Sequence, residues 1–511
     1  KPNGDNQMDY DVLSRISKDS QNQNLVSDVI GNTSQLDETT PFSINQNLNY
    51  YYTLNETNIF AFEAQHLLKD EDPFYNAIIE DKENYESTGV SIGLDGDQQN
   101  YNINQNRRIK SSQLDAKLDY YYIINPKSNL NVTFGSIFSH QKFNSNLFQF
   151  LDDGLAFNPT PNFNNGLAIN DIEYNFKDIY LGAHYRLKVG KFTITPGFSL
   201  HSYGNNNTQF GQKFKDNFFK IMPDFETRVQ FKNSESLTLR YDMQNQFTDI
   251  TKLAQGLVLN NFSNIQFGEP ELQNALSHNL SLLYSSFNLF NYTNVFARLA
   301  YSKNIDQIRN ITSFENVIST NTFFNSNFAD ESATAFGRIQ RTFGKLIASV
   351  NLSFNYSKIN QLIDSRRSVN TGFTRSYTPR LRTNFKKAPN ISLKYKYTVS
   401  INNQGPNETT FYTSAPSLDF DAYIWKSVTL KTDYTFTNQS LRGGNSDNFQ
   451  TWNASISYRK NRDTKWEFEV VATNLLDIDS KVSNTATNLF VSESRIFIQP
   501  RFITFRLRYE L

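Results

Sequence analysis

The sequence contains no cysteine, three tryptophans, three methionines and five histidines among 511 residues. The missing cysteine excludes disulfide bonds, thiolate metal sites and a cysteine nucleophile. The metal motif H-E-x-x-H, the nucleophile elbow G-x-S-x-G and the phosphate-binding P-loop are absent as well. We therefore predict that the protein is not an enzyme, and we predict no cofactor and no metal site.

Long apolar runs and an excess charge are also missing. No apolar stretch reaches the ~18 residues of a transmembrane helix. Lysine plus arginine and aspartate plus glutamate each number 50, whereas a nucleic-acid-binding protein carries a basic excess. The mean hydropathy is −0.56. We predict no nucleic-acid partner. A transmembrane β-barrel is still compatible with these values, because only alternate residues of its strands face lipid.

The abundant residues are those that form strands. The chain has 44 phenylalanines and 27 tyrosines. Aromatic side chains are enriched in β-strands, and tyrosine also occurs at membrane interfaces.

The last stretch of the chain, RFITFRLRYEL, shows the pattern most clearly. Alternation with a period of two indicates a strand with one apolar and one polar face. Such a strand suits a barrel wall, with lipid on one side and water on the other. The expected outer face holds Ile503, Phe505, Leu507, Tyr509 and Leu511, and the inner face holds Thr504, Arg506, Arg508 and Glu510.

The same alternation repeats along most of the chain, for example over 114–122, 179–187, 348–356 and 391–399. A soluble β-sandwich also alternates, but it rarely sustains strands of about ten residues over hundreds of residues, as a membrane barrel does. We therefore predict an all-β fold, a large transmembrane antiparallel β-barrel over residues 41–511, with about 19 or 20 strands in this chain. Residues 1–40 are polar and are predicted to form a loop and one early strand.

Short and long connections alternate. Short turns occur, for example, at 55–56, 190 and 344–345, and the longer polar loops are 70–110, 144–172, 202–215, 251–275 and 476–494. In outer-membrane barrels the short turns are periplasmic. The first clear strand and the last strand then both run from outside to inside. Antiparallel closure needs an upward strand between them, from residues 1–40 or from before Lys1. The first residues contain no signal peptide, so we expect Lys1 not to begin the precursor.

Three stretches resemble TonB-dependent outer-membrane receptors, in the SusC-like style of the Bacteroidota. One is the mid-barrel loop with Gly268, Pro270 and Leu272. Another is WEFEVVATNLLD at 466–477, and the third is the terminal strand, which ends at Leu511 instead of the usual aromatic residue.

The resemblance implies a complete barrel of 22 strands with an N-terminal plug, which imports a scarce or large ligand across the bacterial outer membrane. The expected partners are outer-membrane lipid and a surface lipoprotein or other outer-membrane complex subunits. We find no plug and no TonB box in this chain, so TonB is expected as a partner only if both lie upstream. A non-transporting scaffold barrel within a larger complex and a plugless passive pore stay open as alternatives.

Charged residues predicted on the lumen side have both signs, which argues against a strongly ion-selective pore. Two histidines on the same side could line a ligand path or simply be solvated. The candidate lumen-lining residues are His184, His201, Arg240, Arg298, Arg338, Arg506, Arg508, Asp242, Glu467 and Glu469. The candidate ligand or partner contacts in extracellular loops are Phe148, Phe157, Phe163, Phe323, Phe324 and Tyr412.

Overall fold

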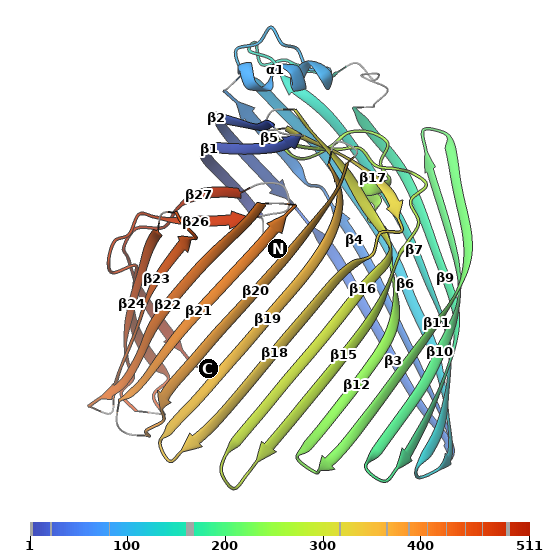
Figure 1. The fold of residues 1–511 in the computed structure, drawn as a ribbon, viewed down its shortest axis with the longest axis vertical. Helices are drawn as coiled ribbons and strands as arrows, with labels where there is room; N and C mark the ends of the chain where they lie inside the picture. The colour runs from blue at the N-terminus through green and yellow to red at the C-terminus, as the bar shows by residue number, and fades with distance from the viewer. Residues whose placement is uncertain are drawn as a thin grey trace.

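A computed structural model describes residues 4–20, 23–80, 82–159, 168–315, 318–363, 366–386, 389–405, 407–425, 427–444, 446–461, 463–486 and 491–510. Within them, nineteen long strands form one antiparallel meander in chain order, as predicted (Figure 1). Its first half consists of β3 (Phe42–Asn55), β4 (Asn58–Glu71), β6 (Tyr101–Asn125), β7 (Ser128–Phe150), β9 (Ile169–Val189), β10 (Phe192–Gln209), β11 (Gln212–Lys232), β12 (Glu235–Gln246), β15 (Ala275–Asn288) and β16 (Thr293–Glu315). Its second half consists of β18 (Asp330–Phe343), β19 (Leu346–Ile363), β20 (Arg366–Thr383), β21 (Asn390–Gln404), β22 (Asn407–Ile424), β23 (Val428–Leu441), β24 (Ser446–Tyr458), β25 (Trp466–Thr473) and β28 (Phe502–Tyr509).

The terminal strand has the two faces that its sequence predicts. β28 pairs with β25 from Phe502 opposite Thr473 to Tyr509 opposite Trp466. Phe505 is 82% exposed on the apolar face. On the other face Arg506 and Arg508 lie 3.4–3.5 Å from glutamates of β25. Exposed apolar side chains on the outer face are what a wall in contact with lipid requires. Leu511 lies outside the described residues.

The two ends of the barrel differ as the connection lengths predict. Tight turns join the strands at one end, and α1 (Lys82–Ser91) and the long loops gather at the other (Figure 1). The short turns mark the periplasmic end. Among the described residues, no helix combines the length and the apolar character needed to cross a membrane.

The described residues of 4–39 form two strands, where the sequence predicted a loop and one early strand. β1 (Gly4–Ser20) pairs with β2 (Gln23–Thr39), and Thr33–Glu38 of β2 pair with β5 (Phe74–Ile79). β2 lies beside β5, and β3 lies beside β4. β2 and β3 follow one another in the chain, with a break at Pro41. The pairing of β1 ends where its first residue, Gly4, is opposite Thr39 of β2, so β1 does not extend beside β3. Within the described residues β3 pairs with β4 alone, and β28 pairs with β25 alone.

Several strands exchange their apolar face part-way along. In β9, Ile172, Tyr174 and Phe176 are buried on the inner face, whereas farther down Leu181 and Tyr185 are exposed on the outer face. In β9, the apolar residues are therefore even-numbered above the point where the apolar face changes sides, and odd-numbered below it. Apolar side chains face inward in water and outward in lipid, so the exchange marks the outer surface of the bilayer.

The same exchange occurs in β6 and β7 at matching height. Tyr101 and Ile103 are buried in the upper part of β6, and Phe143 is buried in the upper part of β7. Leu114 and Phe138, which are opposite one another in the register, are exposed below. We call the extracellular parts of β5, β6, β7, β9, β10 and β11 the collar. The collar has the polar exterior and apolar interior of a soluble protein, and it holds the apolar core of the described chain.

The stretch at 466–477, one of the three that resemble the receptors, contains an asparagine that holds the last extracellular loop together. Asn474, in the ATNLLD stretch, has a φ of 51°, a left-handed conformation that asparagine tolerates better than most residues. Its amide nitrogen donates to the carbonyl oxygens of Ile478 at 2.7 Å and Gln499 at 3.0 Å, and its amide oxygen accepts from the N–H of Ile478. One buried side chain therefore joins both ends of the loop that carries β26 (Ser480–Ala486) and β27 (Val491–Phe497).

Candidate functional site

The loop between β12 and β15 folds into the mouth of the barrel. It contains η1 (Ile250–Leu253), β13 (Val258–Asn261) and β14 (Asn264–Gln266), and we call residues 247–274 the cap. Leu253, Leu257, Leu259 and Ile265 of the cap are at most 1% exposed. They pack in the two apolar clusters that also contain the inward side chains of the collar. The cap is therefore a packed element, and the sequence predicted only a polar loop here.

Buried amide side chains of the wall bind the backbone of the cap. The amide nitrogen of Gln105 donates to the carbonyl oxygen of Leu257 at 2.9 Å, and its amide oxygen accepts from the N–H of Leu259 at 2.9 Å. Asn170 accepts from the N–H of Gly256 at 2.8 Å and donates to the same carbonyl oxygen at 3.1 Å. Both amides are almost fully buried, which makes their hydrogen bonds costly to lose.

A third amide acts in the same way on the next strand. Gln209 donates to the carbonyl oxygen of Leu253 at 2.6 Å and accepts from the N–H of Gln255 at 3.1 Å. We call Gln105, Asn170 and Gln209, which come from β6, β9 and β10, the wall amides. Each donates and accepts at once, as a neighbouring β-strand would, so the wall amides fix both the position and the direction of the cap backbone.

Two glycines allow close backbone contacts, Gly256 between the cap and β9 and Gly268 within the cap itself. A Cβ at Gly256 would lie 2.1 Å from the carbonyl oxygen of Ile169, and one at Gly268 would lie 2.3 Å from the carbonyl oxygen of Lys252. Any larger residue would push the backbone apart at these points. Gly268 belongs to the G-x-P-x-L stretch that resembles the receptors, and this contact gives the glycine a physical reason.

Further contacts join the cap to the surrounding loops. β14 pairs in parallel with β17 (Ile318–Ser326), and the amide of Asn325 both accepts from and donates to the backbone of Gln273. Within α1, burial raises the pKa of Tyr85. Burial also lowers the pKa of Arg107, a guanidinium that lies 3.4 Å from the carbonyl oxygen of Leu259.

Below the cap, the inner face of the barrel is polar and its charges are distributed unevenly. Residues 275–305, 332–363 and 366–407 contain no aspartate or glutamate. By the alternation of their register, the charged side chains that these segments of β15 to β21 present to the lumen are all cations. We call these residues the cationic wall: Arg298, Arg338, Arg380, Arg382, Lys394 and Lys396.

Part of the cationic wall surrounds a cavity. Arg338, Arg380 and Arg382 line a space of about 200 Å³, and no carboxylate is among its lining residues. The Nε of Arg380 donates to Ser392 at 2.8 Å, which holds the guanidinium in place. Its Nη2 lies 3.3 Å from Asp419 on β22, at the edge of the wall. Three arginines around one cavity with a single carboxylate at the edge give a local positive field.

One family of known proteins matches most of the chain. The sequence profile of the outer membrane protein beta-barrel family matches residues 74–509. The chain belongs to this family. The family and the fold place the protein in the bacterial outer membrane. No curated protein sequence matches the chain.

Several solved structures are similar to this outer membrane beta-barrel protein. The siderophore receptor PiuA from Acinetobacter baumannii is 10% identical, with a TM-score of 0.46, over 94% of this chain and 65% of the receptor. A mutant of the Serratia marcescens hemophore receptor HasR, in complex with its hemophore and heme, is 10% identical, with a TM-score of 0.43, over 99% and 75%. The ferric citrate transporter FecA is 10% identical, with a TM-score of 0.41, over 94% and 70%. The chain thus spans less than two thirds of the length of PiuA.

By strand alternation, the ten predicted lumen residues share the face opposite the exposed apolar side chains, and their contact with a ligand stays a prediction. Arg240 lies 3.3 Å from Glu226, and Asp242 lies 3.4 Å from the amide of Asn279. The four charged residues of β25 and β28 pair with one another across the two strands, and these are Glu467, Glu469, Arg506 and Arg508. Arg298 and Arg338 belong to the cationic wall. The predicted lumen residues have both signs of charge, and the two signs are segregated along the sheet.

Each of the two predicted lumen histidines contacts an aspartate side chain. His201 lies 3.0 Å from both carboxylate oxygens of Asp178, and its ring stacks between Tyr180 and Tyr203. His184 lies 2.9 Å from Asp224. Both rings are held within the sheet, so a direct role on a ligand path stays a prediction. Among the residues that the structure describes, no cluster of histidine and carboxylate side chains could hold a metal ion.

The predicted loop aromatics are in different settings. Phe148 lies in β7 and makes an edge-to-face contact with Phe150, and Phe157 lies in the two-residue strand β8 (Ala156–Phe157). Phe323 packs against the cap cluster, with the ammonium of Lys252 5.7 Å from its ring.

The remaining loop aromatics also differ from one another. Tyr412 lies within β22, opposite Val399 of β21, and its role as a contact residue stays a prediction. Phe324 is half-buried in β17, and Phe163 lies outside the described residues.

Proposed function

We propose that this protein is a receptor-type barrel that takes up an anionic ligand, too large or too scarce for diffusion, across the outer membrane. We further infer that it belongs with the TonB-dependent receptors of the SusC-like kind, on the three sequence stretches described above. Energy from TonB requires a plug and a TonB box upstream, and a surface lipoprotein or other complex subunits are the proposed partners.

The observation that carries the proposal is the cap, which is packed into the mouth and bound by three buried wall amides. An open diffusion pore needs a clear mouth, and a scaffold has no use for an inward loop held above a polar lumen. A packed cap above a charged lumen is suited to a route that opens only for a selected ligand.

The cationic wall supports an anionic ligand. Its arginines can each form two parallel hydrogen bonds to a carboxylate or phosphate. Along the described wall, Arg338 and Arg382 have no carboxylate within ion-pair distance, so their charge is available to a passing anion.

A growth experiment in the native host tests uptake. The gene is deleted, and growth is compared on a panel of single nutrient sources supplied at limiting concentration. The deletion strain should lose growth on at least one anionic source, and the wild-type gene should restore it. The triple variant Arg338→Gln, Arg380→Gln, Arg382→Gln should restore growth poorly. The matched control Arg375→Gln, which removes an arginine from the outer face of β20, should restore it fully.

The alternatives predict other outcomes. A passive pore should support uptake that continues when the proton gradient is collapsed. A scaffold should show normal growth on every source together with loss of other outer-membrane proteins from the membrane fraction. Either result would overturn the proposal of selective uptake. Full rescue by the triple variant would refute the anionic ligand and leave uptake itself intact.

A further inference from the structure

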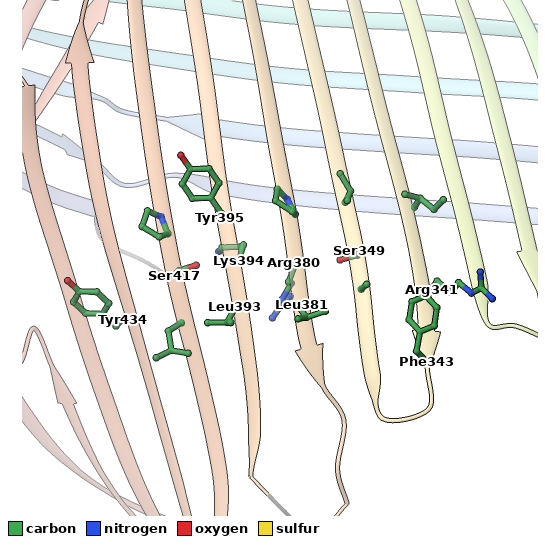
Figure 2. Close-up of a pocket in the computed structure, with 16 residues that line it drawn as sticks. Arg341, Phe343, Ser349, Arg380, Leu381, Leu393, Lys394, Tyr395, Ser417 and Tyr434 are labelled. Carbon is green, nitrogen blue, oxygen red and sulfur yellow. The ribbon is translucent and has the colours of Figure 1, made fainter.

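A groove crosses the outer face of six neighbouring strands, from β18 at one border to β23 at the other (Figure 2). Its volume is about 740 Å³, and its lining is almost entirely apolar. The side chains that line it from the outer face include Phe343, Ala348, Leu381, Leu393 and Tyr395. The inward-facing residues between them contribute to its floor. The groove opens on the outer face, whereas the cationic-wall cavity opens on the inner face, and Ser349 and Arg380 contribute to the lining of both.

Two prolines and an alanine shape the groove. In one row across three strands, Tyr395 lies between Pro379 on β20 and Pro416 on β22. The backbone pairing skips a step beside each proline, between β20 and β21 and between β22 and β23. Proline has no N–H and is rare inside a central strand, so two in one row mark a local departure from a regular sheet. Their short rings and Ala348 leave a depression between larger neighbours.

The groove lies in the periplasmic half of the wall. Phe343 ends β18 directly before the tight turn at Gly344, and Ala348 follows that turn on β19. Leu381 and Leu393 lie in the same cross-strand row as Ala348, and the row of Pro379, Tyr395 and Pro416 is the next one up. The depression therefore begins near the periplasmic surface of the bilayer and extends toward its centre.

A cation stands at the periplasmic end of the groove. Arg341 is opposite Ala348 in the register, which places it on the outer face, and its guanidinium lies over the ring of Phe343 at 4.9 Å. Arg341 is exposed, and no carboxylate of the described residues lies within ion-pair distance of it. A cation on the lipid side of a barrel is costly at the bilayer centre and tolerated near the interface, where it meets lipid headgroups.

We propose that this groove binds one anionic phospholipid of the periplasmic leaflet, with an acyl chain along the row of leucines and the phosphate on Arg341. Three observations favour a lipid: the groove faces the membrane, its walls are apolar, and Arg341, the lining cation on the outer face, stands near the periplasmic turn at headgroup depth. An arginine recognises a phosphate through parallel hydrogen bonds, and basic sites at the membrane edge select anionic headgroups.

Two variants separate the acyl-chain contact from the headgroup contact. Ala348→Phe fills the depression without changing charge, and Arg341→Gln removes the cation without changing shape. Each has a matched control on the outer face outside the groove. Ala297→Phe adds the same ring on β16, and Arg375→Gln removes another exposed arginine, farther from the periplasm on β20.

Native mass spectrometry of the purified full chain in mild detergent is the test, with added phosphatidylglycerol or phosphatidylcholine as probes. The wild-type protein should retain one phosphatidylglycerol after activation that strips other lipids. Ala348→Phe should weaken this retention about tenfold, equivalent to ~1.4 kcal/mol. Arg341→Gln should retain both lipids equally, and the two controls should behave like the wild type.

Other outcomes would overturn the proposal. Retention of phosphatidylglycerol and phosphatidylcholine to the same degree by the wild type would show nonspecific annular lipid only. An equal loss in Ala297→Phe would assign the effect to general disturbance of the lipid face. Unchanged retention in Ala348→Phe would show that the lipid binds elsewhere. Because the variants can be checked for folding by the heat-dependent gel shift of barrels, a misfolded protein would not be mistaken for a result.

Discussion

Removing one wall amide tests whether the cap is held as the structure indicates. Gln105→Met keeps the length of the side chain and removes both of its hydrogen bonds. The carbonyl oxygen of Leu257 keeps its bond from Asn170 at 3.1 Å, but the N–H of Leu259 loses its 2.9 Å partner. An unsatisfied buried donor costs about 1–3 kcal/mol. If this cost falls on the docked cap alone, opening of the cap becomes roughly 5- to 150-fold more populated.

Hydrogen exchange of the backbone is the measurement. In the wild-type protein, the amides of Gly256 and Leu259 should exchange slowly, since both are hydrogen-bonded to buried side chains. In Gln105→Met both should exchange faster by the stated factor, while the strands below the collar stay unchanged. Gln141→Met is a matched control on β7, because the only hydrogen bond given by its side chain joins Ser139 and not the cap.

Two results would refute this reasoning. Equal exchange of the cap amides in the wild type and in Gln105→Met would show that the apolar contacts alone hold the cap. Equal acceleration in Gln105→Met and Gln141→Met would show that the change acts on the whole collar instead of on the cap.

Three further predictions concern the rim, the cap and the lipid face. Arg309→Met should lower the unfolding free energy in detergent by about 3–5 kcal/mol, because its buried carboxylate partner at 2.7 Å loses its counter-ion. Gly268→Ala should accelerate exchange in the cap, whereas Gly337→Ala, whose added Cβ meets no atom within 4 Å, should not. Phe505→Arg should destabilise the barrel by about 2–4 kcal/mol in a lipid bilayer, and Thr504→Arg on the inner face should have little effect.

The spanning strands could be predicted from the sequence because each of them carries its own signal. Alternation at 503–509 requires an apolar face and a polar face whatever lies beside the strand, and β28 has both. The order of short turns and long loops likewise depends only on local composition. These signals do not reveal which residues of a long loop fold inward.

The cap was missed for that reason. Its buried leucines are surrounded by asparagine, glutamine and glycine, so residues 247–274 look like a polar loop. A signal was nevertheless present in β9, where apolar residues occupy even positions up to Phe176 and odd positions from Ile179 onward. Such an exchange of face indicates a strand that leaves the membrane and packs against something inside. The polar residue Asn170, on the newly apolar inner face, is the kind of exception that indicates a specific partner.

The charge pattern of the lumen could also have been read in part. The absence of aspartate and glutamate from 366–407 is visible in the sequence, but its effect depends on which strands are neighbours. Only the sheet order places Arg338 and Arg380 around one cavity. Tyr412 shows another limit of prediction from sequence, because a residue near a turn signal can still lie within a strand.

Most strands of the collar have an upper part that is surrounded by water and a lower part that is surrounded by lipid. Above the exchange of faces, folding is driven by removal of apolar side chains from water, which carries a large positive heat capacity of unfolding. Below it, apolar side chains face lipid in the folded state and gain nothing from burial inside. Collar and cap should therefore respond to urea and to cooling as a soluble domain does, while the membrane part responds to lipid composition and bilayer thickness. A single unfolding temperature would then describe neither part, although the same backbone runs through both.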